Sequence, residues 1–212
     1  DQHFSLAEMI DQEKLSSDVV LARAALIEGD ATSVMLDYSR MLAGQPSIAK
    51  EQSVSMFMLQ NISGAMLSQS LREAPPALQA SLLFPYVSGL NFCHALLRKG
   101  GYRAIDRAFS RPPESTEEIL HPQIYLRGKR DFTVPADPQM PEELGLKEQK
   151  PVFRDTLGEF FVSTLLATWV SPQQASEAAS GWGGDRVVLY PREGERKWAL
   201  AWQLLWDSKD DA

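Results

Sequence analysis

The segment Leu15–Leu42 decides the fold, and its central stretch reads Ala24-Ala25-Leu26-Ile27-Glu28-Gly29-Asp30-Ala31-Thr32. Successive residues of a helix are rotated by about 100°, which places the apolar residues of this segment on one broad arc. The arc contains Val20, Ala24, Ile27, Ala31, Val34, Met35 and Tyr38. Glu28 also falls inside the arc, whereas Arg23, Asp30 and Asp37 cluster on the far side. We therefore expect one long helix that turns a single carboxylate toward the packed side chains.

A carboxylate on a packing face needs a positively charged partner, because burying an unpaired charge costs several kcal/mol of folding free energy. For Glu28 that partner is either a buried Arg or Lys side chain or a metal ion, and the local sequence leaves both open. The neighbouring Gly29 carries a second expectation. A glycine inside a helix costs about 1 kcal/mol relative to alanine and usually marks the close approach of another backbone.

The composition is that of an ordinary globular protein, with 44% hydrophobic and 23% charged residues among 212. The net charge of -7, with no basic block longer than Gly128–Arg130, argues against nucleic acid or an anionic membrane surface as the partner. No run of eighteen apolar residues occurs, so we expect no transmembrane segment. Cys93 is the single cysteine, which excludes an intrachain disulfide and a thiol-rich zinc site.

Helical signals dominate the first two thirds of the chain. We expect helices over residues 4–13, 48–73 and 102–109. A long helix should run from a cap at Ser16–Asp18 to a stop at Gly44–Pro46, and another should begin at Ala77, break at Phe84–Pro85 and resume from Tyr86 to Arg98. A short helix should run from the capping box at Ser115–Glu118 to Pro122. A methionine-rich stripe on the 48–73 helix is typical of core filling. Residues 126–152 carry little periodicity and predict a long internal loop.

The last third mixes helix and strand signals. Asp155 is placed to cap a helix to about Val170, and Ser171–Gln174 is a capping box for the next helix. Residues 186–190 and 198–202 predict a β-hairpin, and Gly181–Arg186 a tight turn with an Asp–Arg pair. The sequence thus predicts an α+β fold, mainly α-helical, with a C-terminal antiparallel hairpin, in one domain spanning 1–212. The abrupt start at Asp1 and end at Ala212 suggest part of a longer protein.

No local spacing makes a metal or nucleophile site. His3, His94 and His121 are too scattered to chelate a metal together, and Cys93 and His94 are adjacent helical positions that point about 100° apart. His121 precedes Pro122 on a stiffened segment, which makes it the best functional histidine of the chain, although the sequence favours a histidine that only caps the helix end.

Several separated segments resemble a family of bacterial gluzincin-like zinc metallopeptidases. They are Asp1–Leu6, Ala25–Ala31, Pro85–Gly89, Pro112–Pro122, Thr156–Glu159 and Gly181–Arg186. The resemblance implies a zincin-like helical subdomain in which Glu28 is the third zinc ligand. It further implies that Tyr86, or more weakly His121, stabilises the oxyanion as metal-activated water attacks a peptide bond. Tyr86 as a core tyrosine bonded to backbone is the plain alternative.

The chain departs from that family in one respect, since its 212 residues contain no His-Glu-x-x-His motif. We therefore expect zinc only in a complete protein, and an incomplete, inactive peptidase domain here. The motif either lies upstream of Asp1 or is lost in a degenerate relative. By resemblance the substrate is a peptide or protein and the location is extracytoplasmic or secreted.

Two other functions stay open at this point. The first is a noncatalytic helical domain that binds a protein or peptide, with Glu28 paired to a buried arginine and Trp182, Trp198, Trp202 and Trp206 as core or partner surface. The second is a glycosidase that uses Glu28 and Glu159 as paired carboxylates, which requires them on facing walls of a cleft. The oligomeric state has no signature in the sequence.

Overall fold

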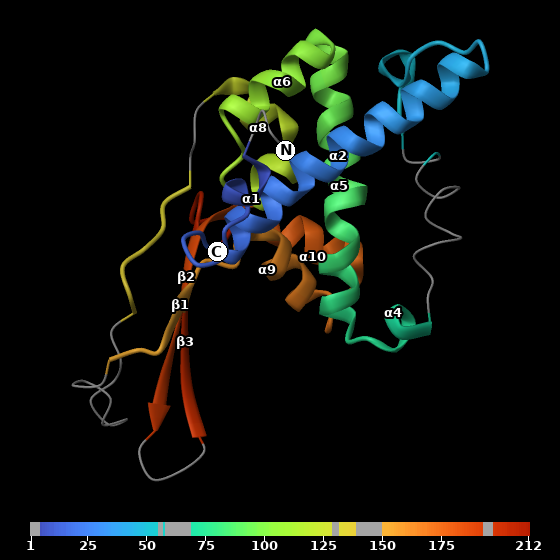
Figure 1. The fold of residues 1–212 in the computed structure, drawn as a ribbon. Coiled ribbons are helices and arrows are strands. Elements are labelled where there is room, and N and C mark those ends of the chain that lie inside the picture. The colour runs from blue at the N-terminus through green and yellow to red at the C-terminus, as the bar shows by residue number, and fades with distance from the viewer. Residues whose placement is uncertain (1–4, 55–56, 58–68, 129–131, 139–149, 193–196) are drawn as a thin grey trace. The chain divides into compact units, whose positions relative to one another are not determined.

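The computed structural model describes residues 5–54, 57, 69–128, 132–138, 150–192 and 197–212. The chain forms two compact units, of which the first contains residues 1–15 and 19–129 and the second contains 16–18 and 130–212. Helices build the first unit, and two helices with a small antiparallel sheet build the second (Figure 1). The predicted α+β, mainly helical class is therefore confirmed, while a single domain over 1–212 stays a prediction.

Helix α2 (Ser17–Leu42) has the predicted length, but its buried face is not the predicted one. Besides Asp18 in the first turn, the fully or nearly buried positions are Ala22, Ala25, Leu26, Gly29, Ser33 and Leu36. Val34, Met35 and Tyr38 of the expected apolar arc are at least half exposed, whereas Arg23, Asp30 and Asp37 are half-buried rather than turned to water. Small residues such as Ala25, Gly29 and Ser33 form the centre of this packing face, because they let another backbone come close. Glu28 is only partly buried and lies at the margin of the face.

The close approach predicted at Gly29 is confirmed, and its partner is Gly89 of helix α5 (Pro76–Gly100). A Cβ atom on Gly29 would lie 2.2 Å from the Gly89 carbonyl oxygen, and one on Gly89 would lie 2.1 Å from the Ala25 carbonyl oxygen. Figure 1 shows α2 (blue) crossing α5 (green) at this place. The two helices therefore touch backbone to backbone, with no room for a side chain.

Helix α5 runs without the predicted interruption at Phe84–Pro85. Pro85 is buried inside the helix, where its ring costs one backbone hydrogen bond but the packed surroundings hold the helix together. Within the described part of the chain, α5 has the length and hydropathy of a membrane-spanning helix, which many core helices share. It packs against α6, α7, α8 and η1 of the same unit, and nine of its residues are buried.

The other helices of the first unit are short. They are α1 (Leu6–Met9), η1 (Ile48–Lys50), α4 (Gln69–Glu73), α6 (Tyr102–Ser110), α7 (Thr116–Leu120) and α8 (Pro122–Arg127). The helix predicted over 48–73 does not begin at residue 48, because residues 48–50 form a single 3-10 turn and residues 51–54 are not helical. Most of its methionine stripe (residues 58–68) lies outside the described residues. Helix α8 was not predicted, although Pro122 stands at its first turn, where proline is well tolerated.

The second unit is built on a three-stranded antiparallel sheet in the order β1–β2–β3. Strands β2 (Trp182–Arg192) and β3 (Lys197–Trp206) confirm the predicted hairpin, with Val187 opposite Trp202, and the connecting residues 193–196 lie outside the described ones. Strand β1 (Phe153–Asp155) falls where a helix cap was predicted. Of the loop predicted over 126–152, residues 126–127 belong to α8, and the described residues 132–138 and 150–152 contain neither helix nor strand.

Helices α9 (Gly158–Leu166) and α10 (Pro172–Ala179) complete this unit. The capping box of α10 is confirmed, since Ser171 and Gln174 make both reciprocal contacts. The prediction that Asp155 caps α9 is wrong, because its carboxylate accepts hydrogen bonds from the backbone N–H and the hydroxyl of Ser17. The Asp185 carboxylate instead accepts hydrogen bonds from the backbone N–H groups of Leu157 and Gly158 at the start of α9. A residue far along the chain thus caps this helix, which no local pattern reveals.

The turn expected at Gly181–Arg186 is not formed, because residues 182–186 belong to strand β2, which carries a bulge between Trp182 and Gly184. The Asp185 carboxylate is fully buried and accepts from the indole N–H groups of Trp182 (3.1 Å) and Trp202 (3.0 Å). Arg186 is not its partner and lies near Asp137 instead. Trp182 is core, whereas Trp198 is 60% exposed.

Candidate functional site

The crossing of α2 and α5 brings together two of the residues singled out in the sequence, Glu28 and Tyr86. Both side chains are half-buried. The Tyr86 hydroxyl lies near enough to the Glu28 carboxylate for the charge of Glu28 to influence it. Burial is the main reason that the pKa of Tyr86 lies above its usual value, and the nearby charge of Glu28 raises it further. This tyrosine is therefore a neutral hydrogen-bond donor near a carboxylate.

The glycine contact explains why the two side chains meet. Glu28 directly precedes Gly29, and Tyr86 lies three residues, or about one turn, before Gly89. With the two glycines in backbone contact, residues that flank them on neighbouring faces come close enough to influence each other electrostatically. Neither a buried Arg nor a buried Lys is needed to explain the position of Glu28, since the margin of a packing face leaves it partly hydrated.

His121 occupies the junction between α7 and α8. Its backbone N–H donates to the Glu117 carbonyl (2.8 Å), and its own carbonyl accepts from Ile124 N–H (2.8 Å). The residue thus ends one helix and begins the next, in keeping with the helix-end alternative. A catalytic role for its imidazole stays a prediction.

The other sulfur and imidazole groups near the crossing have structural roles. The Cys93 thiol is buried and lies 3.7 Å from the Leu26 carbonyl oxygen. Burial, and secondarily the charge of Asp30, raises the pKa of this thiol well above its usual value, so little thiolate forms near neutral pH. His94 is buried, and its Nε2 lies 3.0 Å from the Ile48 carbonyl oxygen.

A complete zinc site cannot be built from the described residues alone. No group of three or more His, Cys, Asp or Glu side chains with metal-binding geometry occurs among them. Glu28 is one carboxylate donor, and the sequence lacks the histidine pair that would accompany it. Glu28 belongs to the first unit and Glu159 to the second, so the paired carboxylates of a glycosidase stay a prediction as well.

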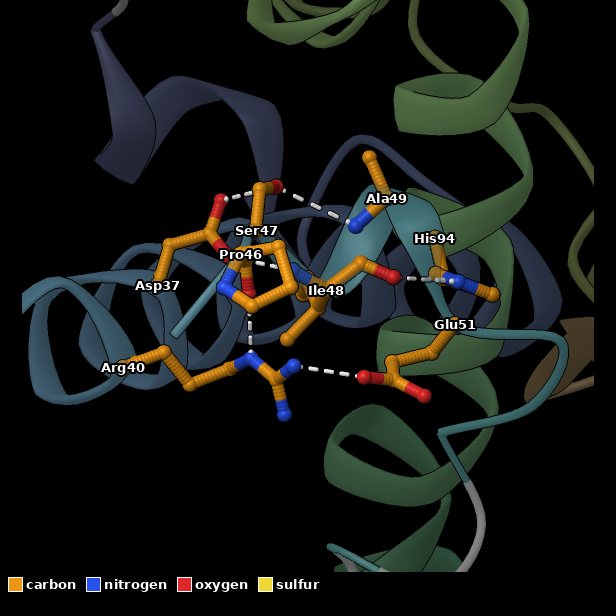
Figure 2. Close-up of polar contacts among 8 residues, drawn as sticks. All are labelled: Asp37, Arg40, Pro46, Ser47, Ile48, Ala49, Glu51 and His94. Atoms are coloured by element: carbon orange, nitrogen blue, oxygen red, sulfur yellow. Dashed lines mark hydrogen bonds and ion pairs between the residues drawn. The ribbon is translucent and has the colours of Figure 1, made fainter. Parts of the chain in front are cut away.

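Asp37 organises a second polar cluster on α2 that the sequence did not point to, because its helical position suggested contact with water alone. Its carboxylate accepts from the Ser47 hydroxyl (2.8 Å), the Ile48 N–H (2.6 Å) and the Tyr102 hydroxyl (3.0 Å). Figure 2 shows Asp37 and Arg40 reaching the segment that contains η1, with His94 on its other side. These contacts fasten the segment after α2 to both long helices.

A pocket of about 560 Å³ lies beside this cluster. Its walls come from the exposed end of α2 and from Tyr102, and they are mainly apolar apart from Asp37, Gln45 and Ser47. Burial and the hydrogen bond to Asp37 raise the pKa of Tyr102 well above its usual value, so its hydroxyl stays protonated. The pocket offers an apolar surface with hydrogen-bonding groups at its edge.

Comparison with known proteins gives one family match. Residues 147–212 match the model described as Domain of unknown function (DUF8575), which corresponds to most of the second unit. No curated protein and no solved structure gives a significant match to the chain. The candidate site at Glu28 and Tyr86 lies outside the matched residues.

Proposed function

We propose that this chain is the downstream part of a zinc peptidase-like domain, to which it contributes Glu28 as a metal ligand and Tyr86 as a hydroxyl donor. The observation that carries the proposal is the proximity of these two side chains, which come from different helices and were each singled out for a role in such a site. In such a site a carboxylate binds the metal ion, and a protonated hydroxyl donates to the developing oxyanion.

The chain by itself does not supply the residues of a complete zinc site. The histidines and the general base have no counterpart in a His-Glu-x-x-His motif within these 212 residues. In the proposal they come from another segment of the protein, and without that segment the chain is inactive. The substrate class, peptide or protein, follows from the family resemblance.

Zinc content of the longest natural form of the protein tests the ligand role. Glu28→Gln removes the charge with almost no change in shape, and we expect bound zinc to fall, with affinity lower by at least about 100-fold. Asp30→Asn is the matched control, because it makes the same change on the same helix at another half-buried position. Equal, stoichiometric zinc in the wild type and in both variants would remove Glu28 as a ligand.

Tyr86→Phe tests the hydroxyl separately. We expect peptide turnover to fall by about 10²–10³-fold with zinc content unchanged, the effect of losing one donor to a developing oxyanion. Circular dichroism checks that the variant folds. If turnover is unchanged, Tyr86 is a structural residue and the peptidase proposal loses its second member.

A noncatalytic binding domain is the second candidate, and the exposed end of α2 favours it. Val34, Met35, Tyr38, Met41 and Leu42 are between 50% and 70% exposed. A row of exposed apolar side chains is typical of surfaces that bind another protein. Under this alternative, a preparation of the longest natural form contains no zinc whether or not Glu28 is present.

A further inference from the structure

A basic pocket lies where α5 ends and α6 begins, away from Glu28 and Tyr86. It has a volume of about 360 Å³ and is lined by Leu96, Lys99, Ala104, Arg107, Arg111 and Tyr125, among others. Three of these side chains are cationic and no acidic side chain lines the pocket. Such a concentration of positive charge is notable in a chain of net charge -7.

Arg111 is held in place by Tyr125. The centre of its guanidinium group lies 5.0 Å from the centre of the Tyr125 ring, and its Nη2 donates to the Tyr125 carbonyl (3.2 Å). The Tyr125 hydroxyl in turn donates to the Arg111 carbonyl (2.8 Å). An arginine that is already ordered loses little conformational freedom when it binds a ligand, so this one is prepared for recognition.

Arg107 is brought to the same pocket by the reversal of the chain at Gly100 and Gly101. Gly101 has a φ of 63°, which glycine adopts without strain, and α6 then starts at Tyr102. As a result Arg107 returns over the end of α5, where a Cβ atom on Gly100 would lie 3.3 Å from its Nη2. Lys99, the penultimate residue of α5, completes the set.

Among the residues that the structure describes, no acidic side chain is paired with the three cationic side chains of this pocket, Lys99, Arg107 and Arg111. Asp106 is next to Arg107 in sequence, but its charge acts on Asp30 of α2, where it adds to the effect of burial in raising the pKa of that carboxyl. Lys99, Arg107 and Arg111 are exposed, so their charges are accessible to an anion from solution.

We propose that this pocket binds the phosphate group of a small organic phosphate. Two guanidinium groups and an ammonium group match the charge and the several oxygens of a phosphate, and guanidinium forks bind such groups through two parallel hydrogen bonds. The Leu96, Ala104 and Tyr125 side chains give an apolar floor for the rest of the molecule. The volume falls within the range of small-molecule sites, about 300–1,000 Å³.

Titration of the 212-residue chain with pyrophosphate, followed by calorimetry at about 0.15 M salt, tests the site. We expect saturable binding at one site, and Arg107→Gln to weaken it at least about tenfold because a charged, forked donor is lost. Arg103→Gln is the matched control: it removes the same charge from another exposed position of α6 that does not line the pocket, and should leave the affinity unchanged. Arg107 is preferred to Arg111 as the test position, since Arg111 also packs on Tyr125.

Sedimentation with vesicles separates the two sources of phosphate. Vesicles of phosphatidylcholine alone and with phosphatidic acid are compared. Binding of pyrophosphate without vesicle binding assigns the site to a soluble phosphate, and binding of phosphatidic acid that Arg107→Gln abolishes and Arg103→Gln preserves assigns it to a lipid headgroup. Equal losses in the two variants, or no saturable binding of either probe by a chain with native circular dichroism, overturn the proposal.

Discussion

Gly29 and Gly89 are in backbone contact, with the Gly89 carbonyl oxygen 2.2 Å from where a Gly29 Cβ would be. This contact fixes how closely α2 and α5 cross. Because Glu28 adjoins one glycine and Tyr86 lies a turn before the other, the same contact fixes the distance between the two candidate site residues. The crossing of α2 and α5 and the candidate site of the first unit therefore both depend on glycine at positions 29 and 89, where a side chain would not fit.

Gly29→Ala should destabilise the first unit strongly. The added methyl group would meet backbone atoms of Gly89 and, at 2.9 Å, the sulfur of Cys93, and backbone cannot rotate away as a flexible side chain can. We expect the free energy of unfolding to fall by about 3 kcal/mol or more, the upper range for overpacking. Urea unfolding followed by circular dichroism measures the change.

Gly44→Ala is the control for that experiment. Gly44 has a φ of 67°, but a Cβ there would meet nothing within 4 Å. Only the left-handed backbone conformation then opposes the substitution, at a cost of about 1 kcal/mol. A loss at Gly29 no greater than the loss at Gly44 would contradict the close contact of the helices.

The sequence allowed the prediction of elements that carry their own local signals. The start and end of α2, the capping box of α10 and the alternating hairpin of β2 and β3 are all present. The buried face of α2 was predicted wrongly because the prediction used the hydrophobicity of the side chains and ignored their size. Ala25, Gly29 and Ser33 are buried because small residues allow the close approach of another helix. Pro85 likewise did not break α5, because tertiary packing outweighs the loss of one hydrogen bond.

The candidate site was predictable only in part, and for a related reason. Glu28 and Tyr86 were chosen by residue type and resemblance, but their proximity depends on the crossing of two helices far apart in the sequence. Helical rotation alone places Asp37 toward water and does not show that the hydroxyl groups of Ser47 and Tyr102 come to it. The basic pocket was missed for the same reason, as Tyr125 joins it only through the packing of α8.

Asp185→Asn should destabilise the second unit. The carboxylate accepts from two backbone N–H groups at the start of α9 and from two indole N–H groups, and an amide would present its own N–H to at least one of these donors. We expect a loss of about 3 kcal/mol, as for a buried charged hydrogen-bond acceptor. Tryptophan fluorescence during urea unfolding reports it, and Asp210→Asn, at an exposed position, should change nothing.

Tyr102 should make the stability of the first unit depend on alkaline pH. Burial and the hydrogen bond to Asp37 raise its pKa in the folded state, so the unfolded chain loses this proton first, near pH 10. The contribution of Tyr102 is then complete below about pH 10 and falls as the pH rises toward the folded pKa. Unfolding at pH 9 to 11 should show a steeper loss of stability for the wild type than for Tyr102→Phe, and identical slopes would contradict the assignment.

Cys93 should report directly on the crossing of α2 and α5. Its thiol is buried there, and burial with the charge of Asp30 raises its pKa, so little reactive thiolate forms and none is accessible while the helices stay together. Since opening is needed for reaction, labelling by an aromatic disulfide at pH 8 should be at least about 10³-fold slower in the folded chain than in urea. As Cys93 is the single cysteine, the signal has one source. The methyl group added by Gly29→Ala would press against this sulfur, so this variant should be labelled faster than the wild type, whereas Gly44→Ala should not. A thiol that reacts equally fast in native and denatured protein would show that the two helices are not in contact at their crossing.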